Sequence, residues 1–560
     1  MVLNKTMHGK GIDRDKRRCL YNRMPRWLLP VLTALVAVLC YVPFSHMGFT
    51  CGDDLENYLI TRQGWGACVE HAQGLAAQQG RFYFLVAQPC YDLPWAVDDW
   101  GYTHVLQYGM LLVSYLLFAR LLLVMWGSQP LAWLTLLLLI VQTPITGNNH
   151  MPFMAYPFVF AFSCSLMWVA LTQYVRYCQK GDRWRLWLGS ALFFAAALFY
   201  ETYVLFLALL CLFAVVRHWR RDGFVAMWRK GDFYGELLPF VTAGLCYVAL
   251  YVAYRSHQLH LHPDAAFYTG ASMSDEFSVA HFFRILQRCT QIVMPMKNFL
   301  LYHTECTVNY FGDNAADSVL FALRHASARV YVVAVVAGGL LYWLMERMEV
   351  GRWSVRRIVA VMGVALAAAF LSHTLIAVTP KYNNDWYAWM QGYVTSYFSF
   401  FGIVLVLAML AVLMLTLFRD KPVLDRWARL GMVGVAMCVL VVEGYTNENL
   451  SHEWQRSQSR FEEIDRLHDE GAFLALPEEA VVYTGELYAS SVWGSSMTKE
   501  NDFIDQYIRM RTGLDLHCAN SQASLESLRE QHPDAPVYVL RQVEPPRCAC
   551  VEVSLEKSLL

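Results

Sequence analysis

The chain has 560 residues, of which 56% are hydrophobic and 16% are charged, and its formal net charge is −1. The apolar residues occur in long runs, which excludes a single large soluble core and indicates a membrane protein. Lys and Arg gather in short segments between these runs and form no continuous basic stripe, so no nucleic-acid partner is expected.

Residues 1–26 form a basic segment ahead of the first apolar run. Its Lys and Arg side chains precede an uncharged stretch at 27–44. A cleaved signal peptide is the alternative, but no small-residue cleavage site follows, and the run is longer than the apolar core of such a peptide. We therefore expect a cytoplasmic N-terminus followed by an uncleaved first helix.

About eleven segments are long and apolar enough to cross the bilayer, for which a helix needs roughly 20 residues. They are 27–45, 104–126, 130–146, 152–174, 186–201, 202–217, 236–254, 329–345, 357–378, 396–418 and 427–444. The two short segments that meet at Tyr200-Glu201-Thr202 are expected to form a hairpin that only just reaches the outer face.

The connecting segments 176–185, 217–230, 347–357 and 419–429 are rich in Lys or Arg. Cytoplasmic loops carry this excess, which agrees with a cytoplasmic N-terminus. An odd number of spans then places the C-terminus outside. The expected location is the plasma (inner) membrane of the cell, with several passes through it.

Three regions follow from this topology: the basic segment 1–26, a membrane domain at 27–444, and an extracytoplasmic domain at 445–560. The outer loops of the membrane domain are 46–103, 255–328 and 379–395. In the tail, helical periodicity at 453–470 and 521–531 and strand-like runs at 480–483 and 537–540 predict a small α/β domain. The expected fold class is an all-α polytopic membrane protein with about eleven transmembrane helices and this C-terminal α/β domain.

Cysteines in the outer segments permit disulfides, because an oxidising compartment favours them. Cys68 with Cys90, and Cys518 with Cys548 or Cys550, are the expected pairs. Free thiols are the alternative. The spacing of Cys548 and Cys550 does not fit a zinc site, and no metal site is expected.

Asp53, Asp54 and Glu56 follow the first span, close to the outer surface of the bilayer. A carboxylate at this depth can accept a proton from an acceptor hydroxyl, and its neighbour can orient it, bind a cation or hold a raised pKa. A helix N-cap is the alternative for Asp53 or Asp54.

Two further charged residues lie where a lipid headgroup would be. Arg81 is flanked by aromatic residues and suits a phosphate, or else it anchors the chain at the interface. Glu201 lies between the two short apolar segments. An acid near hydrocarbon is expensive unless it faces a cavity or a partner, so Glu201 is a candidate substrate-binding residue, with a wet turn as the alternative.

The segment 379–397 combines a cation, amides, hydroxyls and aromatic rings at the outer leaflet. Lys381 is expected to bind a phosphate, and Trp386 or Tyr387 to stack on a sugar. Together with Glu56 of the first loop, Tyr382 and Tyr397 complete the candidate substrate-binding residues. An aromatic girdle is the alternative, although it does not explain the Asn, Lys and Asp residues.

This layout resembles the GT-C superfamily of polytopic glycosyltransferases, and more closely its bacterial members with an Asp-Asp pair after the first helix. The shared features are the acidic first loop, its Gly-Arg-aromatic end, the Tyr-Glu-Thr hairpin, the Pro-Lys-Tyr loop and the soluble tail. They extend over nearly the whole chain, although each motif is short. The tail matches no acceptor-binding domain.

The resemblance implies transfer of a hexose or pentose from a polyprenyl-phosphate-linked sugar donor to an envelope glycan, a lipid or a protein. Asp53 or Asp54 would be the catalytic base, and Arg81 and Lys381 would stabilise the leaving lipid phosphate. No cofactor is required, because the donor is already activated. A divalent cation at the carboxylates is permitted but not needed.

Three other functions are compatible with parts of the sequence. A transporter or flippase of a lipid-linked saccharide would carry ionisable residues near the membrane midplane, often in two related halves. A polymerase or ligase of the O-antigen type would share the outer-face chemistry but use diphosphate-linked oligosaccharides. A purely structural membrane protein leaves the Asp pair without a purpose.

Overall fold

The computed structural model describes Pro25 and Leu487 and residues 27–50, 52–97, 100–145, 152–262, 272–296, 315–388, 392–485, 502–544 and 547–553. Eight helical stretches in this part of the chain are long and apolar enough to cross a membrane. They are Leu28–Ser45, Gly101–Trp126, Pro157–Lys180, Glu201–Asp222, Gly231–Leu261, Ala328–Glu346, Ser396–Phe418 and Pro422–His452. The chain is therefore a helical polytopic membrane protein.

The three remaining predicted spans coincide with shorter helices. These are α7 (Gln129–Val141), α9 (Arg183–Phe199) and α17 (Val355–Leu371), with 13, 17 and 17 residues. Polar residues follow α7 and α17 directly, and α9 ends at the turn before Glu201. A total of eleven crossings stays a prediction.

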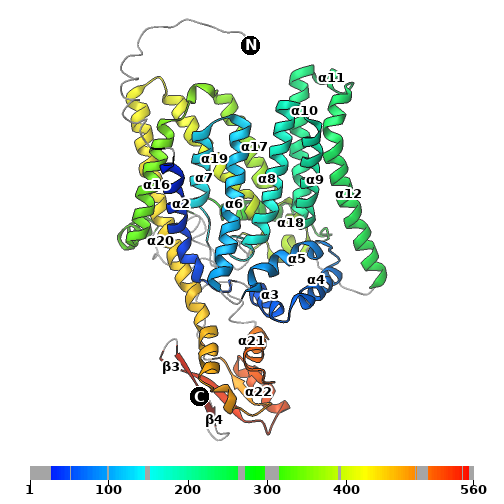
Figure 1. The fold of residues 1–560 in the computed structure, drawn as a ribbon, viewed down its shortest axis with the longest axis vertical. Coiled ribbons are helices and arrows are strands. Elements are labelled where there is room, and N and C mark those ends of the chain that lie inside the picture. Colours follow the sequence, from blue (N-terminus) through cyan, green and yellow to red (C-terminus); the bar gives the residue numbers. More distant parts are fainter. Residues whose placement is uncertain are drawn as a thin grey trace.

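The spanning helices stand side by side in Figure 1 and form the upper body of the molecule. They are α2 (Leu28–Tyr41), α6 (Trp100–Trp126), α8 (Pro157–Lys180), α10 (Phe206–Asp222), α12 (Gly231–Leu261), α16 (Ala328–Glu346), α19 (Ser396–Phe418) and α20 (Pro422–Asp469). The shorter helices α7, α9 and α17 pack against them. Helix α6 packs along α8, α8 along α9, and α17 along α19.

Shape complementarity holds these helices together, because lipid tails remove most of the hydrophobic drive for helix association. Phe118, Trp168 and Phe401 join α6, α8 and α19 through ring centroids 4.8 to 5.0 Å apart. A Cβ at Gly402 would lie 2.5 Å from the carbonyl oxygen of Ala365, so this glycine permits the close approach of α19 to α17.

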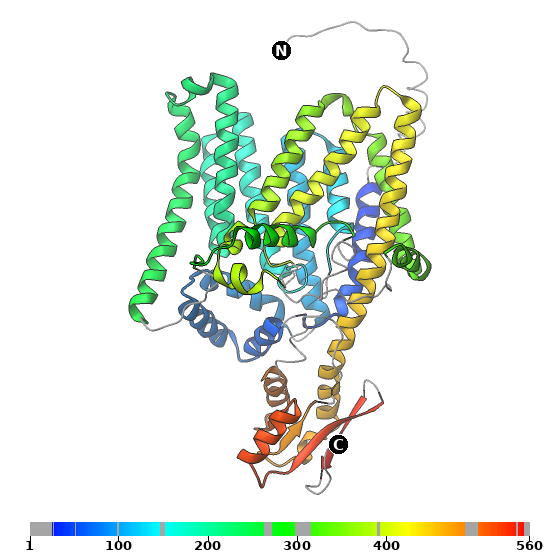
Figure 2. The same cartoon turned by 180° about the vertical axis from the view of Figure 1, so that it is seen from behind.

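Short helices and turns connect the spans. Three of them, α3 (Gly52–Arg62), α4 (Trp65–Gln79) and α5 (Tyr83–Asp92), form the first loop and lie below the bundle in Figure 1. Helix α13 (Val279–Gln291) runs crosswise to the spans in the rear view of Figure 2. The others are η1 (Val42–His46), η2 (Leu93–Ala96), η3 (Glu201–Leu205), α11 (Phe224–Met227), α15 (Ala315–His325), η5 (Val350–Arg352), α18 (Thr374–Ala377) and η6 (Lys381–Trp386). One more short helix, η7 (Phe473–Ala475), lies in the tail.

Helix α20 continues for 48 residues and carries the tail away from the bundle (Figures 1 and 2). The predicted domain boundary at position 445 lies inside this helix. Beyond it, β1 (Val481–Tyr483), β2 (His517–Ala519), β3 (Val537–Glu544) and β4 (Arg547–Val553) form a sheet in the order β2-β1-β3-β4.

In this sheet β1 is parallel to both of its neighbours, and β3 pairs with β4 in the antiparallel direction. Val482 lies opposite Cys518 in β2 and opposite Tyr538 in β3. Two helices accompany the strands, α21 (Asp502–Thr512) and α22 (Gln522–Gln531). Strands β1 and β3 and helix α22 overlap the segments in which the sequence predicts them.

The tail and the first loop share one hydrophobic core. Leu55, Tyr58 and Leu59 of α3 are buried together with Phe461 of α20 and Tyr507 of α21. Phe49 bridges the two parts, with its ring 5.3 Å from Tyr58 and 5.2 Å from Phe461. One face of α3 is therefore fixed by residues that lie about 400 positions later in the chain.

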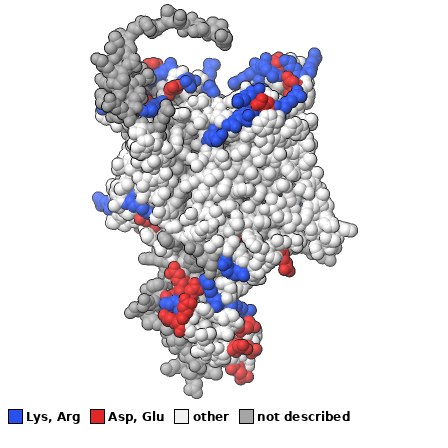
Figure 3. Space-filling model, viewed as in Figure 1, with Lys and Arg blue, Asp and Glu red and all other residues white. Residues whose placement is uncertain are grey.

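Charged residues divide the molecule into zones. In Figure 3, Lys and Arg gather at the end of the bundle away from the tail, the middle belt is almost free of charge, and Asp and Glu are frequent on the tail. An uncharged belt between charged ends is what a bilayer-spanning body requires.

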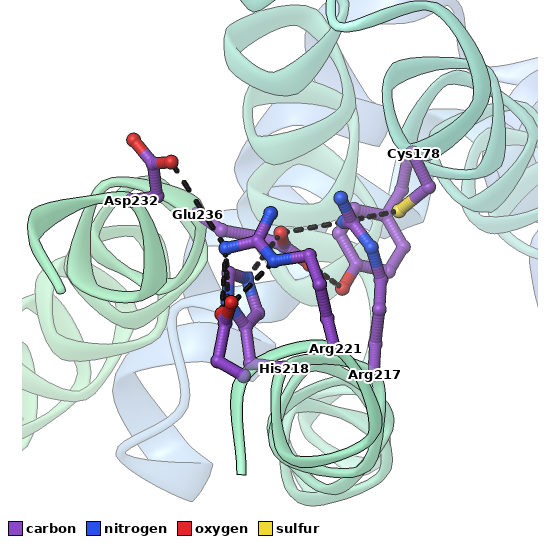
Figure 4. Close-up of polar contacts among 8 residues, drawn as sticks. Cys178, Arg217, His218, Arg221, Asp232 and Glu236 are labelled. Atoms are coloured by element: carbon purple, nitrogen blue, oxygen red, sulfur yellow. Dashed lines mark hydrogen bonds and ion pairs between the residues drawn. The ribbon is translucent and has the colours of Figure 1, made fainter. Parts of the chain in front are cut away.

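A buried ionic cluster lies near the basic end of the bundle (Figure 4). Glu236 of α12 has a side-chain exposure of 1%. It accepts hydrogen bonds from Tyr174 at 2.7 Å and Arg217 at 2.6 Å, and it lies 3.0 Å from Nε2 of His218. The cluster thus joins α8, α10 and α12 through groups that would be costly to bury alone.

The predicted Cys68–Cys90 disulfide is wrong, because both residues are free thiols in the structure. Burial raises the pKa of the Cys68 thiol to about 11, and that of Cys90 to the same value. Cys518 is a free thiol as well, while the side chains of Cys548 and Cys550 lie outside the described part.

Candidate active site

A cavity of about 390 Å³ opens between the first loop and the bundle. Its charged and polar lining residues are Asp53, Glu56, Asn57, His71, Gln79, Arg81, Gln88 and Lys381, and the other residues are Leu75, Tyr83, Phe84, Tyr91, Tyr156, Phe160, Tyr200, Ile376, Tyr382, Tyr393 and Val394. This volume and the mixture of rings with a few polar groups are typical of small-molecule sites.

Helix α3 brings three polar residues to this cavity from one of its faces. Asp53, Glu56 and Asn57 are spaced i, i+3 and i+4, which places them on neighbouring turns of the same side. Leu55 and Leu59 lie on the opposite side and are buried in the core shared with the tail. The amphipathic pattern of α3 therefore decides which of its polar residues meet the cavity.

Asp53 is exposed at the cavity and accepts a hydrogen bond at Oδ2 from the hydroxyl of Tyr156. Tyr156 lies directly before α8, so this contact ties the first loop to the bundle. A carboxylate held by one donor keeps its other lone pairs for a substrate hydroxyl.

Asp54, the second predicted catalytic acid, does not line the cavity. Its side chain is only 2% exposed, and its Oδ2 accepts both the backbone N–H and the hydroxyl of Thr50, each at 2.9 Å. These bonds hold the segment that leads into α3. Asp54 is thus used within the protein, although not as the helix N-cap that the sequence offered as an alternative, and Asp53 alone of the two lines the cavity.

Glu56 and His71 form the next layer of the wall. Oε1 of Glu56 lies 4.0 Å from Nε2 of His71 on α4. Burial, together with the nearby charge of Asp53, raises the pKa of Glu56. Burial lowers the pKa of His71. Both shifts favour the uncharged forms, so this pair can hold or pass a proton beside Asp53.

Arg81 lines the cavity but its charge is already matched. Its Nε and Nη2 donate to the two carboxylate oxygens of Glu201, each at 2.9 Å, and its guanidinium lies 4.3 Å from the ring centre of Tyr83. Glu201 itself is not among the lining residues. The bidentate pair explains how an acid is kept near the bundle, and it leaves Arg81 with less net charge for a phosphate.

Lys381 is the first residue of the π-helical turn η6, and it lines the cavity from a segment far from α3 in the chain. Its ammonium lies 4.5 Å from the ring centre of Trp386 and 5.6 Å from that of Tyr382. Tyr382 also lines the cavity, whereas Trp386 does not. Trp386 therefore contacts Lys381 from outside the cavity lining. Turns of π-helix are frequent at functional sites.

Asn383 fixes this turn. The residue is fully buried, its Oδ1 accepts the backbone N–H of Ser278 at 2.8 Å, and its Nδ2 donates to the carbonyl of Ala377 at 2.9 Å. At least one of the amide side chains near Lys381 therefore has a structural role, because it holds η6 against the segment that contains Ser278.

Tyr397 is fully buried and lies outside the cavity lining. Its ring stacks on Phe153 at 5.0 Å and packs against Phe401 at 5.4 Å. This part of α19 faces the aromatic core of the bundle, so the structure does not bring Tyr397 to the cavity with the other predicted residues.

The cavity residues that the sequence did not predict include Asn57, His71, Gln88 and Tyr156. A helical face through Asp53 would have indicated Asn57, one turn farther along α3. No local pattern singles out the other three, which reach the cavity from α4, α5 and the start of α8. Within the described residues, no group of three or more His, Cys, Asp and Glu side chains is placed to hold a metal ion.

No protein-family model matches this sequence, and no curated protein matches it. Solved structures with a related arrangement include ArnT from Cupriavidus metallidurans in the apo state, at 14% identity and a TM-score of 0.35, covering 92% of both chains. Another is the archaeal oligosaccharyltransferase AglB from Archaeoglobus fulgidus in complex with an inhibitory peptide and a dolichol-phosphate, at 10% identity and a TM-score of 0.37, covering 92% of this chain and 69% of that one. TM-scores below 0.5 assign no residue role or substrate to this chain.

Proposed function

We propose that this chain is a membrane glycosyltransferase of the GT-C type. It transfers a sugar from a polyprenyl-phosphate donor to a glycan, lipid or protein on the outer side of the membrane. The observation that carries the proposal is that one cavity, at the end of an apolar bundle, holds Asp53 on one wall and Lys381 on another.

Asp53 is the proposed general base. The acceptor hydroxyl attacks the anomeric carbon of the donor sugar, its proton passes to the carboxylate of Asp53, and the bond between this carbon and the phosphate oxygen breaks. The electron pair leaves with the polyprenyl phosphate. Lys381 stabilises the charge that develops on this phosphate, a task suited to an ammonium in a partly enclosed site.

Arg81 and Glu201 are proposed to position the donor rather than to neutralise it. Their bidentate pair fixes the guanidinium beside the cavity, and Tyr83 and Tyr382 supply aromatic surface for the sugar or for the first isoprene unit. The apolar belt of the bundle then receives the lipid chain. The proposed reaction requires no cofactor, and a divalent cation at the carboxylates is compatible with it.

The basic end of the bundle is assigned to the cytoplasm, because Lys and Arg are retained on that side. The cavity and the tail then face outward, in the plasma membrane of the cell. The cavity is built from loop helices and span ends rather than from residues in the middle of the spans, which favours an enzyme at the membrane surface over a transporter with a midplane site.

The test compares lipid-linked saccharides in a deletion strain that expresses the wild-type protein, the Asp53→Asn variant or no protein. We expect a polyprenyl-monophosphate sugar to accumulate without the protein and with Asp53→Asn, and to disappear with the wild type. Accumulation of a diphosphate-linked oligosaccharide would instead indicate a polymerase or ligase. Accumulation of a lipid-linked saccharide confined to the cytoplasmic leaflet would indicate a flippase.

A further inference from the structure

Two buried amides, Asn57 of α3 and Gln88 of α5, form part of the cavity wall beside Asp53. Their side chains are 5% and 3% exposed. Nε2 of Gln88 donates to Oδ1 of Asn57 at 2.8 Å and to Oδ1 of Asp92 at 2.9 Å. Both hydrogens of the Gln88 amide are thus used within the wall.

The remaining amide groups point to a ligand. Oε1 of Gln88 and Nδ2 of Asn57 have no hydrogen-bond partner among the described residues. Neither atom is among the fully buried side-chain atoms without a partner, so both are accessible. Since both residues line the cavity, these two atoms are open to it. The wall therefore offers one acceptor and one donor side by side.

Asp92 decides which way these amides face. It is fully buried behind the cavity and does not line it. An ionised carboxylate accepts hydrogen bonds only, so the NH2 group of Gln88, and not its oxygen, must turn toward it. The NH2 group of Gln88 also donates to Asn57, so the oxygen of the Asn57 amide must face Gln88. One buried acid thus sets the polarity of both amides.

We propose that Asn57 and Gln88 recognise a pair of neighbouring hydroxyls on the sugar of the donor, and that Asp92 is the positioning residue for this pair. The inference rests on the proposed function. One hydroxyl accepts from Nδ2 of Asn57, and the next donates to Oε1 of Gln88. Because Asn57 lies one helical turn after Asp53, the sugar hydroxyls are bound next to the proposed general base.

The test uses the full chain in lipid nanodiscs and native mass spectrometry. The probes are four short-chain polyprenyl monophosphates, of which three carry glucose, galactose or mannose and one carries no sugar. For the wild type we expect tighter binding of at least one sugar-bearing lipid than of the bare phosphate, and a preference among the three epimers.

The Asp92→Asn variant should lose this preference. Its new NH2 group can donate to Oε1 of Gln88, so the amide is free to turn and the fixed polarity of the wall is lost. We expect the preference among epimers to fall about tenfold, the effect of one lost hydrogen bond, while affinity for the bare phosphate is unchanged. Asp92→Glu, which again presents an acceptor, should restore part of the preference.

Val69→Ala on α4 is the control, because this side chain is 55% exposed and does not line the cavity; its epimer preference should equal that of the wild type. Asn57→Leu, which keeps the branched shape and removes the amide donor and acceptor, is a second variant in case Asp92→Asn does not fold, and it should lose the preference too. An unchanged preference in a folded Asp92→Asn or Asn57→Leu variant overturns the inference and leaves the proposed function intact. Equal binding of all four lipids by the wild type also overturns the inference, whereas failure of the proposed function is shown by the absence of donor accumulation in the deletion strain.

Discussion

Arg511 in the tail donates from Nη2 to the hydroxyl of Tyr58 at 3.2 Å, across 453 positions of the chain. Arg511 is itself held by Asp465 of α20, whose Oδ1 lies 2.9 Å from its Nε. Tyr58 directly follows Asn57 on α3, the helix that also carries Asp53. The tail therefore braces the back of the helix whose front face meets the cavity, which connects a distant region to the geometry of the site.

Asp53 and Asp54 should differ sharply in function although they are neighbours. We expect Asp53→Asn to lower sugar transfer by roughly 10²- to 10⁴-fold, the usual contribution of a general base. Its thermal unfolding should match that of the wild type. Asp54→Asn should retain most of the activity. Asp54→Ala should lose about 1–3 kcal/mol of stability, since two donors of Thr50 are left unpaired. Full activity of Asp53→Asn would exclude it as the base.

Lys381 and Arg81 should have different roles: Lys381 binds the donor phosphate, and Arg81 positions the donor. Lys381→Ala is expected to raise the KM for the lipid donor more than the KM for the acceptor. For Arg81, a double-mutant cycle with Glu201→Ala should give a coupling energy of about 0.5–3 kcal/mol in thermal unfolding, because each single change leaves a partly buried charge alone. Additive effects of the two changes would show that the pair contributes nothing.

The core shared by α3 and the tail should control both stability and activity. Leu59→Ala removes a buried side chain and should cost about 2–5 kcal/mol. Tyr58→Phe removes only the hydroxyl that Arg511 contacts, and it should lower the rate of transfer with little loss of stability. Val69→Ala on α4, where the side chain is 55% exposed, is the control. A normal rate for Tyr58→Phe would mean that this contact does not tune the site.

Asp92 gives a pH dependence with a defined sign. Burial raises its pKa from 3.8 to about 6. Between these values the folded protein holds a proton that the unfolded chain has lost, so the free energy of unfolding falls as the pH rises through this window. Asp92→Asn removes the effect. Its stability relative to the wild type should rise from pH 4 to pH 7 by up to about 3 kcal/mol, measured by thermal or denaturant unfolding at each pH. A difference that does not change with pH would contradict the raised pKa.

The ionic cluster of Figure 4 should affect folding without affecting the chemistry. Glu236→Gln leaves Arg217 without its buried counter-ion, which should cost about 3 kcal/mol of stability. Transfer by the folded fraction should be normal, because the cluster lies near the other end of the bundle from the cavity. Asp232→Asn is the control, because this member of the cluster is 72% exposed and lies 4.0 Å from Arg221; it should resemble the wild type.

Part of the candidate site could be predicted from the sequence. The sequence placed Asp53, Glu56, Arg81, Lys381 and Tyr382 on segments far apart in the chain, and all five line one cavity. It had no means of finding Gln88 or Tyr156, because their positions depend on how α5 and α8 pack against α3. Trp386 and Tyr397 were included for their chemistry, and packing turned both away from the cavity.

The sequence by itself determined that the chain crosses the membrane repeatedly, because the cost of burying charge in hydrocarbon depends on composition along the chain and not on the fold. Tertiary structure alone decided which of two adjacent aspartates faces the cavity. Successive residues on a helix point about 100° apart, and the rotation of α3 is set by the burial of Leu55 and Leu59 against the tail. The same packing gave Arg81 its partner Glu201, 120 positions away, which no local pattern in the sequence contains.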